Sequence, residues 1–137
     1  MVDLKGQYIK IQKEVDLAMC KVIQSTSFIN GPAVKEFSSN LESYLEIANV
    51  IPCANGTDAL QIALMALGLE KGDEIICPDF TFVATVEVAE LLGLKTVLVD
   101  VDSDTFMLTA EEIEKAITPK TKAIVPVHLF GQCAPME

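Results

Sequence analysis

Three short segments of the sequence combine residue types that could bind or transform a small molecule. The first is residues 54–58, Ala-Asn-Gly-Thr-Asp, which precede an apolar pattern typical of a helix. The amides and positive dipole end of that helix would attract a phosphate, and Thr57 would add a hydroxyl. The alternative is that Asn55-Gly56 is only a turn and Thr57 or Asp58 only a helix cap. The segment lacks the other glycines of G-x-G-x-x-G and the lysine of a P-loop, so neither nucleotide motif is predicted.

The second and third segments follow expected strands. Residues 78–82, Pro-Asp-Phe-Thr-Phe, place two aromatic rings before a helix, where one could stack on a planar cofactor or both could belong to the core. The third segment, residues 128–132, contains His128, the only histidine. A lone histidine is more often a hydrogen-bonded structural group than a catalyst, and no serine or cysteine is placed as its partner.

The remaining polar groups do not predict a metal site. The carboxylates of Asp100, Asp102 and Asp104 alternate as in a metal loop, but the glycine and final glutamate of an EF-hand are missing, so they are interpreted as turn and capping residues. The four cysteines contain no C-x-x-C pair and are interpreted as buried free thiols of a reducing compartment; they are Cys20, Cys53, Cys77 and Cys133.

Two helices are expected to precede these segments. Apolar residues recur at spacings of four and three through the first twenty-two residues, at Leu4, Tyr8, Ile11, Val15, Ala18 and Val22. A second helix is predicted to begin after the turn at residues 30–32, because proline is tolerated in the first helical turn. The first 47 residues therefore form an expected N-terminal helical segment.

From residue 48 to residue 137 the pattern changes to short apolar runs that alternate with helices. Strands are expected at 49–53, 74–77, 96–100 and 123–128, and helices at 57–69, 83–94 and 108–117. This alternation predicts an α/β fold with a mainly parallel, three-layer sheet covered by helices on both faces. Pro52 lacks an N–H donor, so the first strand should end there or lie at an edge.

Composition limits the possible partners. The 137 residues carry 20 acidic groups against 10 lysines and no arginine, a net charge of −10. This balance argues against nucleic acid or an anionic membrane as the partner. The charged N-terminus is unlike a signal peptide, and no run approaches the ~20 apolar residues of a transmembrane helix, so a cytoplasmic location is expected.

Six motifs that occur in order give the chain a family resemblance. Together they are similar to the N-terminal part of a DegT-type nucleotide-sugar aminotransferase, one of the fold type I pyridoxal-phosphate enzymes. The motifs are residues 55–60, 72–76, 78–85, 93–102, 117–124 and 127–131. The resemblance implies that residues 48–137 are the first part of the large cofactor-binding domain of that fold, which would be incomplete here.

The resemblance also implies roles for particular residues. Gly56 and Thr57 match the positions that hold the phosphate of pyridoxal 5′-phosphate (PLP), and Phe82 matches the aromatic residue that stacks on its pyridine ring, whereas Phe80 matches no cofactor contact. The segment Phe28, Ile29, Asn30 and Gly31 resembles one near the sugar-nucleotide pocket. His128 matches a recurrent family position to which no chemical role is assigned.

The implied reaction of the full-length protein is transfer of an amino group, from glutamate, to a keto group of a nucleotide-linked sugar, in a homo-oligomer. The family's catalytic lysine and the aspartate that pairs with the pyridine nitrogen lie beyond residue 137, so no catalytic residue is assigned here. The chain is therefore expected to be an inactive fragment by itself. Two alternatives are a PLP-dependent sugar dehydratase, with histidine in place of that lysine, and a non-catalytic regulatory protein of the same fold.

Overall fold

The computed structural model of the chain describes residues 2–136, in two units that meet between Pro52 and Cys53. The first unit consists of two helices, α1 (Leu4–Ser25) and α2 (Pro32–Leu45). The carboxylate of Asp3 begins α1 by accepting a hydrogen bond from the Gly6 N–H at 2.9 Å. Neither helix has a fully buried residue, so the apolar stripe expected on α1 is not enclosed by the described residues.

The second unit alternates helices with strands, which confirms the α/β class. In chain order its main elements are α3 (Gly56–Ala66), β1 (Glu74–Pro78), α4 (Ala84–Leu91), β2 (Lys95–Val99), α5 (Ala110–Ala116) and β3 (Thr121–Ile124). A short 3-10 turn, Leu129–Gly131, follows β3. The strand order is β2-β1-β3, and both pairings with β1 are parallel, as the sequence predicted.

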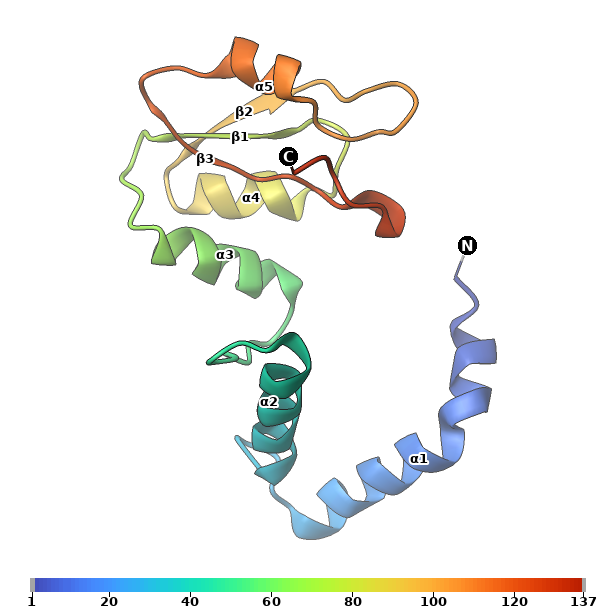
Figure 1. Cartoon of the computed structure of the whole chain (residues 1–137). Helices are drawn as coiled ribbons and strands as arrows, with labels where there is room; N and C mark the ends of the chain where they lie inside the picture. The colour runs from blue at the N-terminus through green and yellow to red at the C-terminus, as the bar shows by residue number, and fades with distance from the viewer. Residues whose placement is uncertain (1, 137) are drawn as a thin grey trace. The chain divides into compact units, whose positions relative to one another are not determined.

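The central strand β1 separates two hydrophobic clusters. All five of its residues are buried, and successive side chains point to opposite faces of the sheet. Ile75 packs with Leu64 of α3 and Val88 of α4 on one face, and Ile76 packs with the Val99 side chain on the other, where Ile113 of α5 joins it. Figure 1 shows α4 and α5 on the two sides of the sheet, which is the predicted three-layer arrangement.

The expected strand at residues 49–53 was wrong, because these residues form no strand. A strand needs a hydrogen-bonded neighbour, and no described strand pairs with this segment. The N–H of Val50 instead donates to the Glu42 carboxylate at 2.9 Å, and Pro52 has no N–H to donate. The last strand is also shorter than expected: it ends at Ile124, two residues before Pro126.

The prediction of buried thiols holds for one cysteine only. Cys77, in β1, is fully buried, and burial raises the pKa of its thiol to about 11, so that it stays protonated at neutral pH. Cys20, Cys53 and Cys133 are free but exposed, because they lie outside the sheet. Among the described residues, no helix is both long enough and apolar enough to span a bilayer.

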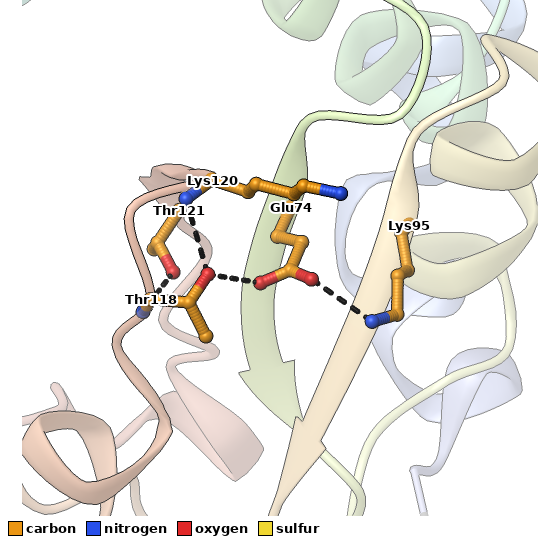
Figure 2. A network of polar contacts seen from close by, with 5 residues as sticks. All are labelled: Glu74, Lys95, Thr118, Lys120 and Thr121. Atoms are coloured by element: carbon orange, nitrogen blue, oxygen red, sulfur yellow. Dashed lines mark hydrogen bonds and ion pairs between the residues drawn. The ribbon is translucent and has the colours of Figure 1, made fainter.

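A polar network holds the beginnings of the three strands together (Figure 2). The buried carboxylate of Glu74, in β1, accepts from Lys95 Nζ of β2 at 2.9 Å and from Thr118 Oγ1 at 2.5 Å. The Glu74 N–H donates to the carbonyl of Lys120, just before β3, at 2.9 Å. Donation from Thr118, followed by the interaction with Lys95, lowers the pKa of Glu74. The carboxylate therefore stays ionised in the folded chain.

Lowering the pH should weaken this network, and substitution of Glu74 should remove that dependence on pH. Because the Glu74 pKa is lowered on folding, its carboxylate stabilises the fold above the ordinary glutamate pKa of about 4.3, and that contribution is lost as the pH falls through the lower folded value. Glu74→Gln should destabilise the protein at pH 7 and flatten the loss of stability between pH 5 and 3. Urea unfolding at several pH values measures both effects. Parallel pH profiles for the two proteins would contradict this role.

Candidate functional site

The beginning of α3 presents two free backbone donors. Asn55 caps the helix: its side-chain oxygen accepts from the Asp58 N–H at 2.9 Å and its carbonyl accepts from the Ala59 N–H at 3.1 Å. The N–H groups of Gly56 and Thr57 make no hydrogen bond to the described residues. Free amides at the positive end of a helix dipole are suited to an anion such as a phosphate.

Gly56, at the beginning of α3, is exposed and has open space where a side chain would begin. A Cβ atom built at Gly56 would meet no atom within 4 Å, and the residue does not have a positive φ. Neither the backbone conformation nor the packing of this chain therefore requires glycine at this position. The free amides, at a helix end where no side chain of residue 56 intervenes, fit the charge of a bound phosphate.

The two aromatic residues of the loop after β1 differ in their contacts and in their exposure. The ring of Phe80 lies against that of Phe106, with centroids 5.3 Å apart. Phe82 makes no such contact, and 74% of its surface is exposed. Its carbonyl accepts from the Thr85 N–H at 3.2 Å and so opens α4. Of the two rings that the sequence predicted as possible stacking partners, Phe82 is the more exposed, since Phe80 is about half covered.

The loop after β3 gives His128 a structural hydrogen bond. Its Nδ1 atom accepts from the Ala134 N–H at 3.0 Å and closes a short loop around the turn at Leu129–Gly131. This arrangement agrees with the structural interpretation of the lone histidine. Asp102 acts as the turn residue that the sequence predicted: its Oδ1 accepts from the Asp104 and Thr105 N–H groups.

The fold brings these loops to one edge of the second unit. Figure 1 shows that α3 and α4 both begin at the end of the sheet where β1 ends, and the turn after β3 lies there too. In open α/β sheets, ligands bind beyond the carboxyl ends of the strands. Gly56, Thr57 and Phe82 therefore belong to the edge where a ligand is expected.

The fourth predicted segment, Phe28–Gly31, lies in the first unit between α1 and α2. Residues 26–32 line a surface hollow of about 440 Å³, and Phe28 and Ile29 are exposed. Asn30 has a φ of 48°, and a Cβ at Gly31 would lie 2.2 Å from the Ser27 carbonyl oxygen. Unlike Gly56, Gly31 is therefore required by the close approach of its own chain.

Sequence reasoning missed two residues of this region. The residue that caps α3 is Asn55, whereas the sequence had suggested Thr57 or Asp58 as a possible cap. The signal for Asn55 was its spacing from Asp58, because a capping side chain accepts from an N–H three residues later. Phe106, the partner of Phe80, had no signal, because the two rings are 26 residues apart in sequence and meet only in the folded loops.

Comparison with known proteins identifies the family. Residues 9–137 match the DegT/DnrJ/EryC1/StrS aminotransferase family, and the chain belongs to it, which confirms the resemblance found in the motifs. Over 136 residues it is 48% identical to the UDP-2-acetamido-2-deoxy-3-oxo-D-glucuronate aminotransferase of Pseudomonas aeruginosa, covering 99% of this chain and 38% of that protein. It is 43% identical to a protein of Geobacillus stearothermophilus called "pleiotropic regulatory protein", covering 100% of this chain and 37% of that protein.

Solved structures agree with this assignment. A DegT DnrJ EryC1 StrS aminotransferase from Brucella abortus superposes with a TM-score of 0.91 at 42% identity, covering 98% of this chain and 38% of that one. NtdA from Bacillus subtilis, with bound cofactor PMP, gives 0.83 at 38% identity, covering 89% and 28%. The chain thus spans under two fifths of the length of these proteins.

Two glycine substitutions should distinguish a glycine that the packing of this chain does not require from one that it does. Gly56→Ala should leave the cofactor-free protein as stable as before or raise its stability by up to about 1 kcal/mol, because nothing opposes the new methyl group. Gly31→Ala should destabilise it by roughly 1–3 kcal/mol, because the methyl group meets a backbone carbonyl. Urea unfolding of the two variants provides the comparison. A clear loss of stability in Gly56→Ala would show that its own chain needs this glycine.

Proposed function

We propose that the full-length protein containing this chain is a PLP-dependent aminotransferase that transfers an amino group, from glutamate, to a keto group of a nucleotide-linked sugar. The observation that supports this most is the beginning of α3, where the amides of Gly56 and Thr57 have no partner among the described residues and Gly56 presents no side chain. Family membership adds the reaction class, because relatives of this chain are named as aminotransferases of nucleotide-linked sugars.

In this proposal the chain holds the cofactor at two points. The amides of Gly56 and Thr57, with the Thr57 hydroxyl, bind the phosphate, and the exposed ring of Phe82 lies against the pyridine ring. When bound, PLP supplies an electron sink for a C–H bond broken next to the substrate nitrogen. The protein residues orient the ring and keep the phosphate in place, so that the reacting atoms meet in one geometry.

The proposal extends to the substrate, assembly and location. The segment Phe28–Gly31 contacts the sugar nucleotide, and the exposed ring of Phe28 and the adjacent hollow suit a planar base or sugar face. The full-length protein is a homo-oligomer, which would cover apolar side chains that stand open in the first unit. It works in the cytoplasm, where a reducing environment suits exposed free thiols such as Cys20 and Cys133.

A regulatory role is the second candidate. The observation that favours it is the name of the Geobacillus stearothermophilus relative, "pleiotropic regulatory protein". A regulator of the same fold could keep the phosphate site and lack turnover. The two candidates therefore differ in what the bound cofactor does when an amino donor is added, and not in whether it binds.

The test is the absorption spectrum of the full-length protein after addition of PLP and then glutamate. We expect the cofactor band to shift as the amino group is taken up, and to shift back when a keto acid is added. A firmly bound cofactor whose spectrum does not respond to glutamate would contradict the aminotransferase and favour the regulatory candidate.

Two substitutions in the same assay test the assignment of residues. Thr57→Ala removes one hydroxyl from the phosphate and should weaken PLP binding by roughly 1–2 kcal/mol. Phe82→Ala leaves the phosphate anchored, and should cost about 0.5–1.5 kcal/mol beyond the lost contact area, with slower turnover. Ser39→Ala, at an exposed polar residue of α2, is the control and should leave PLP affinity unchanged. Equal affinities for all four proteins would overturn the assignment.

A further inference from the structure

The backbone of Phe106 adopts a conformation that a bulky residue rarely takes. Its φ is 58°, in the left-handed region, where a side chain crowds the following carbonyl. Such a residue persists only where its surroundings hold it, and strain of this kind gathers at functional sites. The chain places a phenylalanine there, although a glycine would adopt the conformation freely.

The turn around Asp102 imposes this conformation. Asp102 Oδ1 accepts three hydrogen bonds, from the Asp104 N–H at 3.1 Å and from the N–H and hydroxyl of Thr105 at 2.8 Å each. Its carbonyl accepts from the Phe106 N–H at 2.8 Å, and its N–H donates to Met107 at 3.0 Å. The hydrogen bonds that Oδ1 accepts from Thr105 and Asp104 lower the pKa of Asp102, so the carboxylate is ionised at neutral pH. The next residues, Met107 and Leu108, are buried, which fixes the far side of the turn.

The turn delivers the Phe106 ring to Phe80. Their ring planes are inclined by 35° with centroids 5.3 Å apart, within the range of favourable aromatic pairs. Phe80 stands in the middle of the loop from Asp79 to Phe82. The ends of this loop are held by backbone hydrogen bonds: the Asp79 N–H donates to Val99, and the Phe82 carbonyl accepts from Thr85. In the middle of the loop, the half-exposed ring of Phe80 contacts the half-exposed ring of Phe106.

We propose that Asp102 and Phe106 are positioning residues that, through Phe80, fix the loop that carries Phe82. This inference rests on the proposed function, in which Phe82 lies against the cofactor ring. In this account the turn at Asp102 holds the ring of Phe106 in place, at the cost of strain in the Phe106 backbone. The Phe106 ring holds Phe80, and the loop, fixed at both ends, presents Phe82 to the ligand. Asp102 and Phe106 touch neither cofactor nor substrate.

The variants that test this separate the ring from the backbone strain. Phe106→Gly removes the ring and also relieves the left-handed backbone, so the protein should still fold. Phe106→Tyr keeps an aromatic ring and should rescue the effect. Phe80→Leu removes the other ring of the pair. Ile113→Ala is the control for a general loss of stability: it weakens the cluster of Ile76, Val99 and Leu108 but leaves both rings of the Phe80–Phe106 pair in place.

Two measurements on the full-length protein and its variants test the proposal. The melting temperature of each variant shows whether an effect reflects stability alone. The first is PLP affinity together with the circular dichroism of the bound cofactor, which reports how firmly its ring is held. Loss of the ring pair should weaken binding about threefold to tenfold and reduce the dichroism in Phe106→Gly and Phe80→Leu. Phe106→Tyr should match the unmodified protein, and Ile113→Ala should melt at a lower temperature with unchanged affinity and dichroism.

The second measurement is amide hydrogen exchange of residues 79–87 in the cofactor-free protein. Exchange should be faster in Phe106→Gly and Phe80→Leu and unchanged in Phe106→Tyr and Ile113→Ala. If no variant alters exchange in this loop, or if Ile113→Ala alters it equally, the positioning role is overturned. If the unmodified protein binds no PLP, the proposed function fails, and the exchange result still decides whether the ring pair holds the loop.

Discussion

Burial of β1 is the constraint on which the second unit depends. The strand is hydrogen-bonded on both edges and packed on both faces, and Ile75, Ile76 and Cys77 have no exposed surface. At its start, the Glu74 carboxylate binds Lys95 of β2 and Thr118, and the Glu74 N–H binds the carbonyl of Lys120 just before β3. At its end, Pro78 leads directly into the loop that carries Phe82. One strand therefore links the polar network at one edge of the sheet to the candidate site at the other.

The candidate site is defined by groups that the fold leaves unused. Asn55 satisfies the Asp58 amide, but the amides of Gly56 and Thr57 have no partner among the described residues. The ring of Phe80 contacts that of Phe106 and stays about half exposed, while Phe82 is more exposed and is in no aromatic pair among the described residues. A folded chain satisfies most of its buried polar groups and packs its large rings, so the residues it leaves free at a strand edge are the ones available to a ligand.

The sequence predicted the elements whose signals are local. Apolar periodicity located the helices, and the apolar runs at β1 and β2 were found within a residue or two. It failed where structure depends on a distant partner: residues 49–53 have the apolar character of a strand but no neighbour to pair with, and the thiols of Cys20 and Cys133 are exposed because nothing described covers them. The loop at Gly56 left a phosphate site and a simple helix cap both open, and the family resemblance favoured the phosphate site; the contact of Phe106 with Phe80 required the folded structure.

The most direct test of the account is a crystal structure of the full-length protein grown with PLP. The account predicts the cofactor phosphate at hydrogen-bonding distance, about 3 Å, from the amide nitrogens of Gly56 and Thr57, with the pyridine ring against Phe82. A phosphate bound elsewhere, with the beginning of α3 open to solvent and Phe82 away from the ring, would contradict it.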